Sequence, residues 1–110
     1  MTENRRNEGQ TVVHFIVPPL KADLMRIWKS TFLQPDNTQK VSKMIMNHNI
    51  STFPKWTKIN TNKINTFTLI FERLPKECTS FDLIEDALED GSFHYKNIKR
   101  NFKDIYQIII

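Results

Sequence analysis

The sequence has little glycine, a single cysteine and no long hydrophobic run. Two glycines in 110 residues exclude a glycine-rich loop of the kind that cradles phosphates or a dinucleotide. The lone cysteine, Cys78, cannot form an internal disulfide and leaves the redox compartment open. No stretch approaches the roughly 20 apolar residues that cross a bilayer, so we predict no membrane span.

Residues that could carry catalysis or hold a metal are also sparse. The three histidines, His14, His48 and His94, lie far apart in the sequence, and there is no nucleophile elbow or glycine-rich oxyanion loop. Five carboxylates occur between Asp82 and Asp90, but without the alternating pattern and sharp glycine of a calcium loop. A solvated acidic edge is the expected interpretation of them. We therefore predict no catalytic site, no metal site and no cofactor.

What the chain does contain is the composition of one globular domain. Apolar residues make up 39% and aromatic residues 11%, with eight phenylalanines. The first ten residues, MTENRRNEGQ, show no apolar periodicity and no hydrophobic segment. Residues 1–10 are therefore predicted to be a flexible tail without a secretion signal, and residues 11–110 to form a single domain.

The central stretch is Thr66–Glu85, TFTLIFERLPKECTSFDLIE. Apolar residues alternate along its first part, Pro75 interrupts regular pairing, and the alternation resumes from Ser80. The pattern predicts two strands joined by a polar corner. We expect one dry interior to hold the side chains of Phe67, Leu69, Phe71, Phe81 and Leu83.

Three further segments also have the composition of strands. TVVHFIV at Thr11–Val17 is dense in β-branched residues and stops at two prolines, and His14 within it is expected to be partly exposed. Ser92–Arg100 and Asp104–Ile110 are typical of two short strands near the end of the domain. The apolar end at Ile110 would be a liability unless it were paired within a sheet.

Two segments are ambiguous. Val41–Ser51 is too short and mixed to classify. In Leu24–Gln34, LMRIWKSTFLQ, the apolar residues fit either alternate positions or a helical stripe. We favour a strand here, because the segment runs into a turn at Pro35-Asp36-Asn37 and because of the resemblance given below.

The net charge of +4 is unevenly distributed. Eight lysines and arginines lie between Lys21 and Lys63, against two aspartates in the same region. This distribution favours a solvated surface, with nucleic-acid binding as the alternative.

The remaining candidate surface is aromatic and basic. Trp28 and Trp56 have basic neighbours in the sequence, as in sheets that stack bases or sugar rings. We favour the simpler interpretation, that at least one tryptophan is buried in the core. The candidate binding residues are Arg26, Trp28, Lys29, Lys55, Trp56 and Lys58.

Four segments, VVHFIV, RIWKSTFLQPD, TFTLIFERLPKECTSFDLIED and GSFHYKNIKRNFKDIYQI, carry a resemblance to a known family. In this order they resemble a small immunoglobulin-like β-sandwich accessory domain of uncharacterised function that recurs in Bacteroidota proteins. The resemblance covers Thr11 to Ile110. It implies an antiparallel sandwich with no known catalytic residues, often an amino-terminal module of exported proteins, and hence possible export of this chain.

Together these patterns predict an all-β protein, an immunoglobulin-like antiparallel β-sandwich of about seven short strands. The expected function is that of a non-enzymatic accessory or interaction module that binds another protein or a neighbouring domain. A nucleic-acid-binding protein using Lys21–Lys63 and a glycan-binding module using an exposed tryptophan are the alternatives. The oligomeric state and the compartment are left open.

Overall fold

The computed structural model describes residues 10–85 and 92–110, which are all-β and contain no helix. Residues 1–9 of the predicted tail at 1–10 and three of the five clustered carboxylates, Asp86, Glu89 and Asp90, lie outside the described residues. No helix in the described part is therefore long and apolar enough to span a membrane. The strands are β1 (Gln10–Val17), β2 (Leu24–Met25), β3 (Phe32–Pro35), β4 (Ser42–His48), β5 (Thr57–Lys58), β6 (Asn65–Glu72), β7 (Ser80–Ile84), β8 (His94–Lys99) and β9 (Ile105–Ile109).

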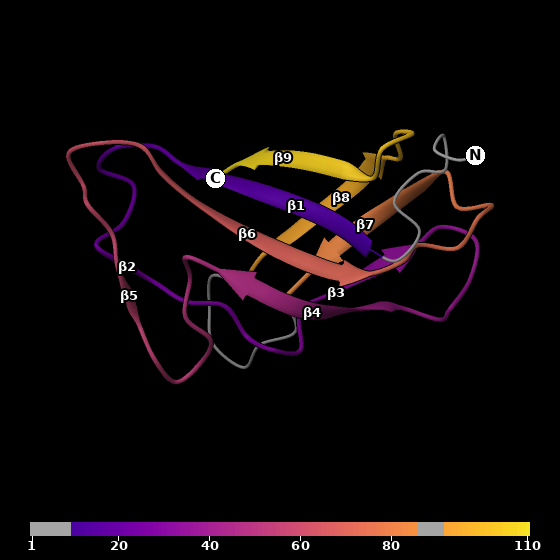
Figure 1. Cartoon of the computed structure of the whole chain (residues 1–110), viewed down its shortest axis with the longest axis horizontal. Helices are drawn as coiled ribbons and strands as arrows, with labels where there is room; N and C mark the ends of the chain where they lie inside the picture. The colour runs from indigo at the N-terminus through magenta and orange to yellow at the C-terminus, as the bar shows by residue number, and fades with distance from the viewer. Residues whose placement is uncertain (1–9, 86–91) are drawn as a thin grey trace.

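Seven of these strands form one sheet in the order β8-β7-β3-β4-β6-β1-β9, and β2 and β5 pair separately at one end (Figure 1). All pairs in the large sheet are antiparallel except β1 and β9, which run parallel with Val12 beside Ile105 and Ile16 beside Ile109. The expectation of a purely antiparallel arrangement is therefore wrong at this edge. Alternation of side chains does not specify the direction of a neighbouring strand, so the sequence pattern could not reveal it.

The core follows from the alternation of apolar residues. In β6 and β7 the five predicted interior side chains are all buried, and in β1 every second residue from Thr11 is fully buried. The rings of Phe15 and Phe67, which face each other across β1 and β6, stack with their centroids 4.6 Å apart and their planes 9° apart. Burial of such rings is the main stabilising contribution available to a domain of this size.

The sheet curls so that its two ends face each other. Phe15 lies on β1, next to one edge strand, yet its ring is 5.9 Å from that of Phe93 and 6.4 Å from that of Tyr95, at the other edge. Tyr106 on β9 packs edge-on against Phe81 on β7, with centroids 4.9 Å apart. The result is a half-barrel whose inner surface forms one core.

The sequence predicted most of these strands. The strands expected at Thr11–Val17, Thr66–Glu72 and in the two last segments are present, although Gln10, assigned to the tail, already pairs with Glu72. The unclassified segment contains β4.

The segment Leu24–Gln34 is neither a helix nor one strand. It consists of β2, an isolated bridge at Ile27, a turn at Trp28–Thr31 and the start of β3. The single-strand prediction was wrong because Ile27 pairs with the distant residue Thr52, a contact that local periodicity cannot show.

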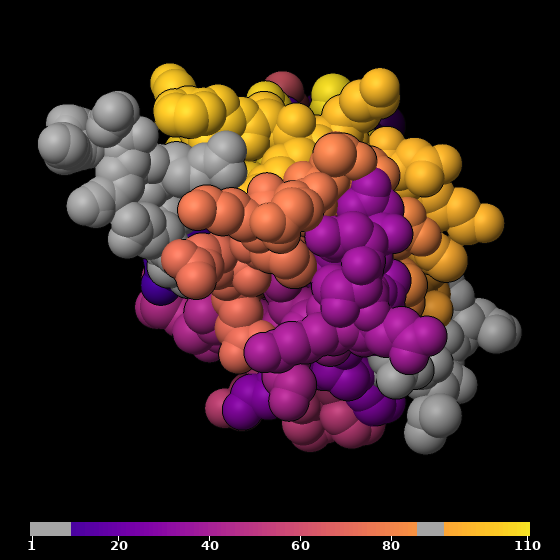
Figure 2. Space-filling model, turned by 90° about the vertical axis from the view of Figure 1, so that its right-hand side faces the viewer, coloured from indigo at the N-terminus to yellow at the C-terminus, as the bar shows by residue number. Residues whose placement is uncertain are grey.

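One end of the half-barrel is closed by polar contacts between connections. Figure 2 shows this end, where the β6–β7 connection (orange) lies between the β3–β4 connection (magenta) and the β8–β9 connection (yellow). Asp36 accepts a hydrogen bond from the Thr79 hydroxyl at 2.5 Å, and the Arg100 guanidinium donates to the carbonyls of Pro75 and Cys78. The β2–β5 pair lies at the opposite end.

Candidate functional site

Four side chains near the β2–β5 pair form a column of three aromatic rings and one cation, in the order Trp28, Phe53, Arg26 and Trp56. The Trp28 and Phe53 rings stack with centroids 4.1 Å apart and planes 17° apart. The guanidinium carbon of Arg26 then lies 4.6 Å from the centroid of the Phe53 ring and 3.8 Å from that of the Trp56 ring. Both distances are within the range of a cation–π interaction.

The backbone around Ile27 positions this column. Ile27 is fully buried, donates its N–H to the Ser51 carbonyl at 2.9 Å and accepts the Phe53 N–H at 2.9 Å. Its two neighbours in the chain, Arg26 and Trp28, are thereby placed beside Phe53. Arg26 also donates from Nη1 to the Pro54 carbonyl at 3.2 Å, which holds the guanidinium between the rings.

A buried carboxylate fixes the other side of Trp28. Glu85 is 7% exposed, and its two carboxylate oxygens accept the backbone N–H of Trp28 at 3.0 Å and of Phe93 at 3.1 Å. The expectation of a solvated acidic edge is therefore wrong for Glu85. Backbone N–H donors replace the water that this carboxylate loses on burial.

The outer end of the column is open to solvent. Trp56 is 51% exposed and Phe53 is 45% exposed, whereas Trp28 is half-buried. Neither tryptophan belongs to the core, so the expectation that at least one would be buried there is wrong. Large aromatic side chains exposed together are typical of contact surfaces.

The column contacts are made by Arg26 and the three rings, and the predicted lysines lie near these residues in the sequence. Lys29 follows Trp28 in a turn, Lys55 precedes Trp56, and Lys58 lies in β5; all three are exposed. Of the six candidate residues, the structure brings Arg26 into contact with Trp56 and links Trp28 to both through Phe53.

Phe53 is the functional candidate that sequence reasoning missed. It is not among the six candidate residues predicted from the sequence. The short aromatic cluster Phe53-Pro54-Lys55-Trp56 is a signal that could have included it.

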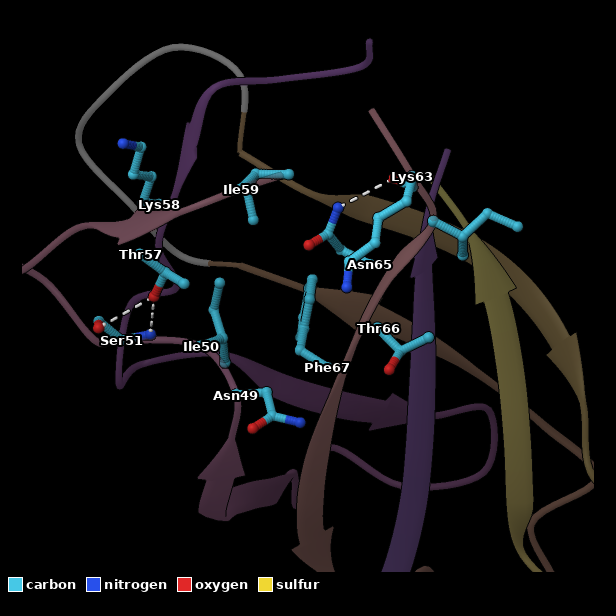
Figure 3. A pocket seen from close by; sticks show the side chains of 11 residues that line it. Asn49, Ile50, Ser51, Thr57, Lys58, Ile59, Lys63, Asn65, Thr66 and Phe67 are labelled. Atoms are coloured by element: carbon cyan, nitrogen blue, oxygen red, sulfur yellow. Dashed lines mark hydrogen bonds between the residues drawn. The ribbon is translucent and has the colours of Figure 1, made fainter. Parts of the chain in front are cut away.

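A hollow of about 560 Å³ lies on the inner side of β5, between that strand and the start of β6 (Figure 3). Its floor is apolar, formed by the buried side chains of Ile50, Ile59 and Phe67. The rim is mainly polar, and Ser51 and Thr57 are tied together there by a 3.0 Å hydrogen bond. Its remaining lining residues are Asn49, Lys58, Lys63, Ile64, Asn65 and Thr66.

The perturbed acid groups lie elsewhere and have structural causes. The hydroxyl of Thr79 lowers the pKa of Asp36 below its ordinary value, and the backbone N–H of Asn97 lowers that of Asp82, with a further contribution from His94. Burial raises the pKa of the Cys78 thiol.

The groups that could bind a metal are likewise dispersed. His14 contacts the Thr68 hydroxyl at 2.8 Å, in keeping with its expected place on the exposed side of a strand. Within residues 10–85 and 92–110, no group of three or more metal-ligating side chains comes together.

No family model matches the chain, and neither a curated protein nor a solved structure matches it. The candidate site is therefore defined by its own geometry.

Proposed function

We propose that this protein is a non-enzymatic interaction module that binds a protein partner through the surface of Arg26, Phe53 and Trp56. The carrying observation is the Trp56 ring, which is half exposed yet held in place by the Arg26 guanidinium 3.8 Å from its centroid. Tryptophan and arginine dominate the energetics of protein interfaces. A ring that is already ordered loses less conformational entropy when it binds.

The resemblance to immunoglobulin-like accessory domains of Bacteroidota is part of this proposal. What supports it is that each of the four segments that carry the resemblance contains described strands, namely β1, β3, β6 with β7, and β8 with β9, although β3 fills only the last part of its segment. On this view the curled sheet is a variant of the sandwich, and the protein acts beside another protein or domain.

The positions of two histidines, His14 and His94, also support a role without catalysis. His94 contacts Asp82 at 3.3 Å on the sheet surface, and His14 is bonded to Thr68, so neither faces the column or the hollow. A general acid or base needs a place within hydrogen-bond reach of a bound substrate.

A second candidate function is the binding of single-stranded nucleic acid. The observation that favours it is that Lys29, Lys55 and Lys58 are exposed and that the Trp56 ring, next to Lys55 in the chain, is exposed as well. Bases could stack on Trp56 while the lysines meet the phosphates, and such binding weakens steeply with salt. Glycan binding would use the same ring, with the hydroxyl and amide groups of the hollow beside it.

A displayed random-peptide library, selected on the wild-type protein, tests the leading proposal. We expect enriched peptides whose binding is lost with Trp56→Ala and kept with Leu20→Ala. Leu20, at 81% exposure, is a matched control for the removal of an exposed apolar side chain. Peptides that bind both variants equally, or no enrichment at all, would overturn the proposal.

Two parallel titrations separate the alternatives. An oligothymidylate that binds with salt-dependent affinity, lost in Trp56→Ala, would favour nucleic acid. A neutral oligosaccharide that binds independently of salt, and whose binding is lost in the same variant, would favour glycans.

A further inference from the structure

The two edges of the large sheet differ in how they meet solvent. At the β8 edge, Lys96 and Lys99 are exposed, Asn97 has a positive φ of 56°, and the register with β7 is irregular between Phe81 and Leu83. Charges and irregular pairing of this kind prevent another strand from adding to an edge. β8 is therefore a blocked edge.

The β9 edge has none of these features. Ile105–Ile109 contains no charged residue and pairs with β1 in regular register along its length. The Val12 N–H bonds to the Asp104 carbonyl and the Ile110 N–H to the Ile16 carbonyl, each at 2.9 Å. In a parallel ladder, residues on one strand point their backbone groups alternately to each side. Even-numbered residues of β9 thus bond to β1, and the odd-numbered residues face away from the sheet.

The outward positions of β9 are Ile105, Gln107 and Ile109. The two isoleucines are 47% and 67% exposed, and Gln107 is exposed as well. One of the outward carbonyls, that of Ile105, already accepts the Asn101 side-chain amide at 2.9 Å and retains a second lone pair. Among the described strands, β9 is paired only with β1, so this row of backbone groups is available.

The order of the outward residues, isoleucine, glutamine and isoleucine, is the same in both chain directions. In an antiparallel pair centred on Gln107, the glutamine faces its own copy and Ile105 faces Ile109 of the second chain. Each facing pair with outward backbone groups exchanges two hydrogen bonds. A two-fold interface requires this kind of self-complementary surface.

We propose that the protein forms a symmetric homodimer in which β9 pairs antiparallel with β9 of a second copy. The chain carries a net charge of +4, but this edge carries none, so two copies can meet here without opposing lysines. A strand from an unrelated protein could use the same hydrogen bonds, but it would not explain the palindromic order of isoleucine, glutamine and isoleucine.

The pairing would also extend an apolar row across the outer face of the sheet. The registers place Ile105, Val12, Ile70 and Met46 side by side on β9, β1, β6 and β4. In the dimer this row continues into Ile109 of the second copy. One edge strand buries less than the ~800 Å² per partner of a standard interface, so the dimer should form reversibly. This proposal is independent of the function proposed for the Trp56 surface.

Sedimentation velocity from about 10 μM to about 1 mM, a range that spans weak association, tests the dimer. We expect the mass to double for the wild-type protein and to stay monomeric for Ile109→Lys. Ile45→Lys is the matched control, since Ile45 is an exposed isoleucine, 48% accessible, on β4 rather than at an edge. It should dimerise like the wild type.

Disulfide trapping tests the register. A mixture of Ile105→Cys and Ile109→Cys proteins should cross-link on mild oxidation, while each variant alone should not, since only the antiparallel register joins 105 to 109. The buried native Cys78 makes the wild-type protein the blank.

Three results would overturn the proposal. They are a mass that stays monomeric at every concentration, a dimer that survives Ile109→Lys or is equally lost in Ile45→Lys, and a cross-link that appears in the Ile105→Cys protein alone.

Discussion

The Asp104 carboxylate accepts hydrogen bonds from both Nε and Nη2 of Arg100, each at 3.0 Å, in an ion pair whose side chains are 1% and 7% exposed. The Tyr106 hydroxyl donates to the same carboxylate at 2.9 Å, and Arg100 also donates to carbonyls of the β6–β7 connection. The pair therefore links the β8–β9 connection to the β6–β7 connection. Such a bidentate, fully bonded pair can persist where water is excluded.

Asp104→Asn should destabilise the fold by about 3 kcal/mol, because it leaves the Arg100 charge buried without its counter-ion. Asparagine tolerates the positive φ of 55° at this position, so the change tests charge rather than backbone conformation. Urea denaturation monitored by circular dichroism measures the loss.

The matched control is the double variant Arg100→Met with Asp104→Asn. Without the buried charge, it should lose less stability than the sum of the two single variants. A loss below about 1 kcal/mol for Asp104→Asn would show that the pair is not buried as described.

Phe15→Ala should cost about 3 to 5 kcal/mol, since the ring is fully buried and contacts rings from both ends of the curled sheet. Leu20→Ala removes an apolar side chain that is 81% exposed and should change stability by less than about 0.5 kcal/mol. Thermal unfolding of both variants measures the two losses of stability. Equal losses would contradict the assignment of the core.

The sequence was sufficient to predict the strands in which apolar and polar residues alternate without interruption. In β1, β6 and β7 one face is buried and the other is not, so the pattern of apolar residues shows both the strand and its inner side. In β4 the register shifts between Met44 and Met46, and Ile45 and Met46 are both exposed, which hides the alternation. A bulge therefore explains why this strand could not be classified.

The candidate site was less predictable, because its geometry depends on contacts between distant segments. Aromatic and basic residues could be listed from the sequence, and Arg26 and Trp56 do lie together. Their contact requires Ile27 to pair beside Thr52, which no local pattern encodes. The half-barrel curl and the parallel β9 also arise from tertiary contacts.

Acid should weaken the fold through Asp36 and Asp82. The pKa of each is lower in the folded protein than its ordinary value of 3.8, because hydrogen bonds favour the charged form. The folded state then binds fewer protons than the unfolded state in this range. The stabilisation is fully present above the unfolded pKa and is lost as the pH falls through the folded pKa.

The free energy of unfolding, measured between pH 7 and pH 2.5, should therefore begin to fall below about pH 5. The free energy of unfolding of the Asp36→Asn variant should fall less steeply over the same pH range, since one of the two carboxyl groups no longer titrates. An unchanged slope would show that the Thr79 hydrogen bonds do not favour the charged form of Asp36.

Fluorescence quenching tests whether the open ring on which the proposed function depends is accessible. Acrylamide should quench Trp56 more strongly than the half-buried Trp28, because the Trp56 ring is 51% exposed. The Trp56→Phe variant, which retains only Trp28, should thus show a smaller quenching constant than Trp28→Phe, which retains only Trp56. Constants that are both low would mean that both rings are covered in solution, and this would remove the glycan alternative together with base stacking on Trp56. Replacement of Trp56 by leucine should also lower stability by about 0.5 to 1 kcal/mol, the usual contribution of an exposed cation–π contact.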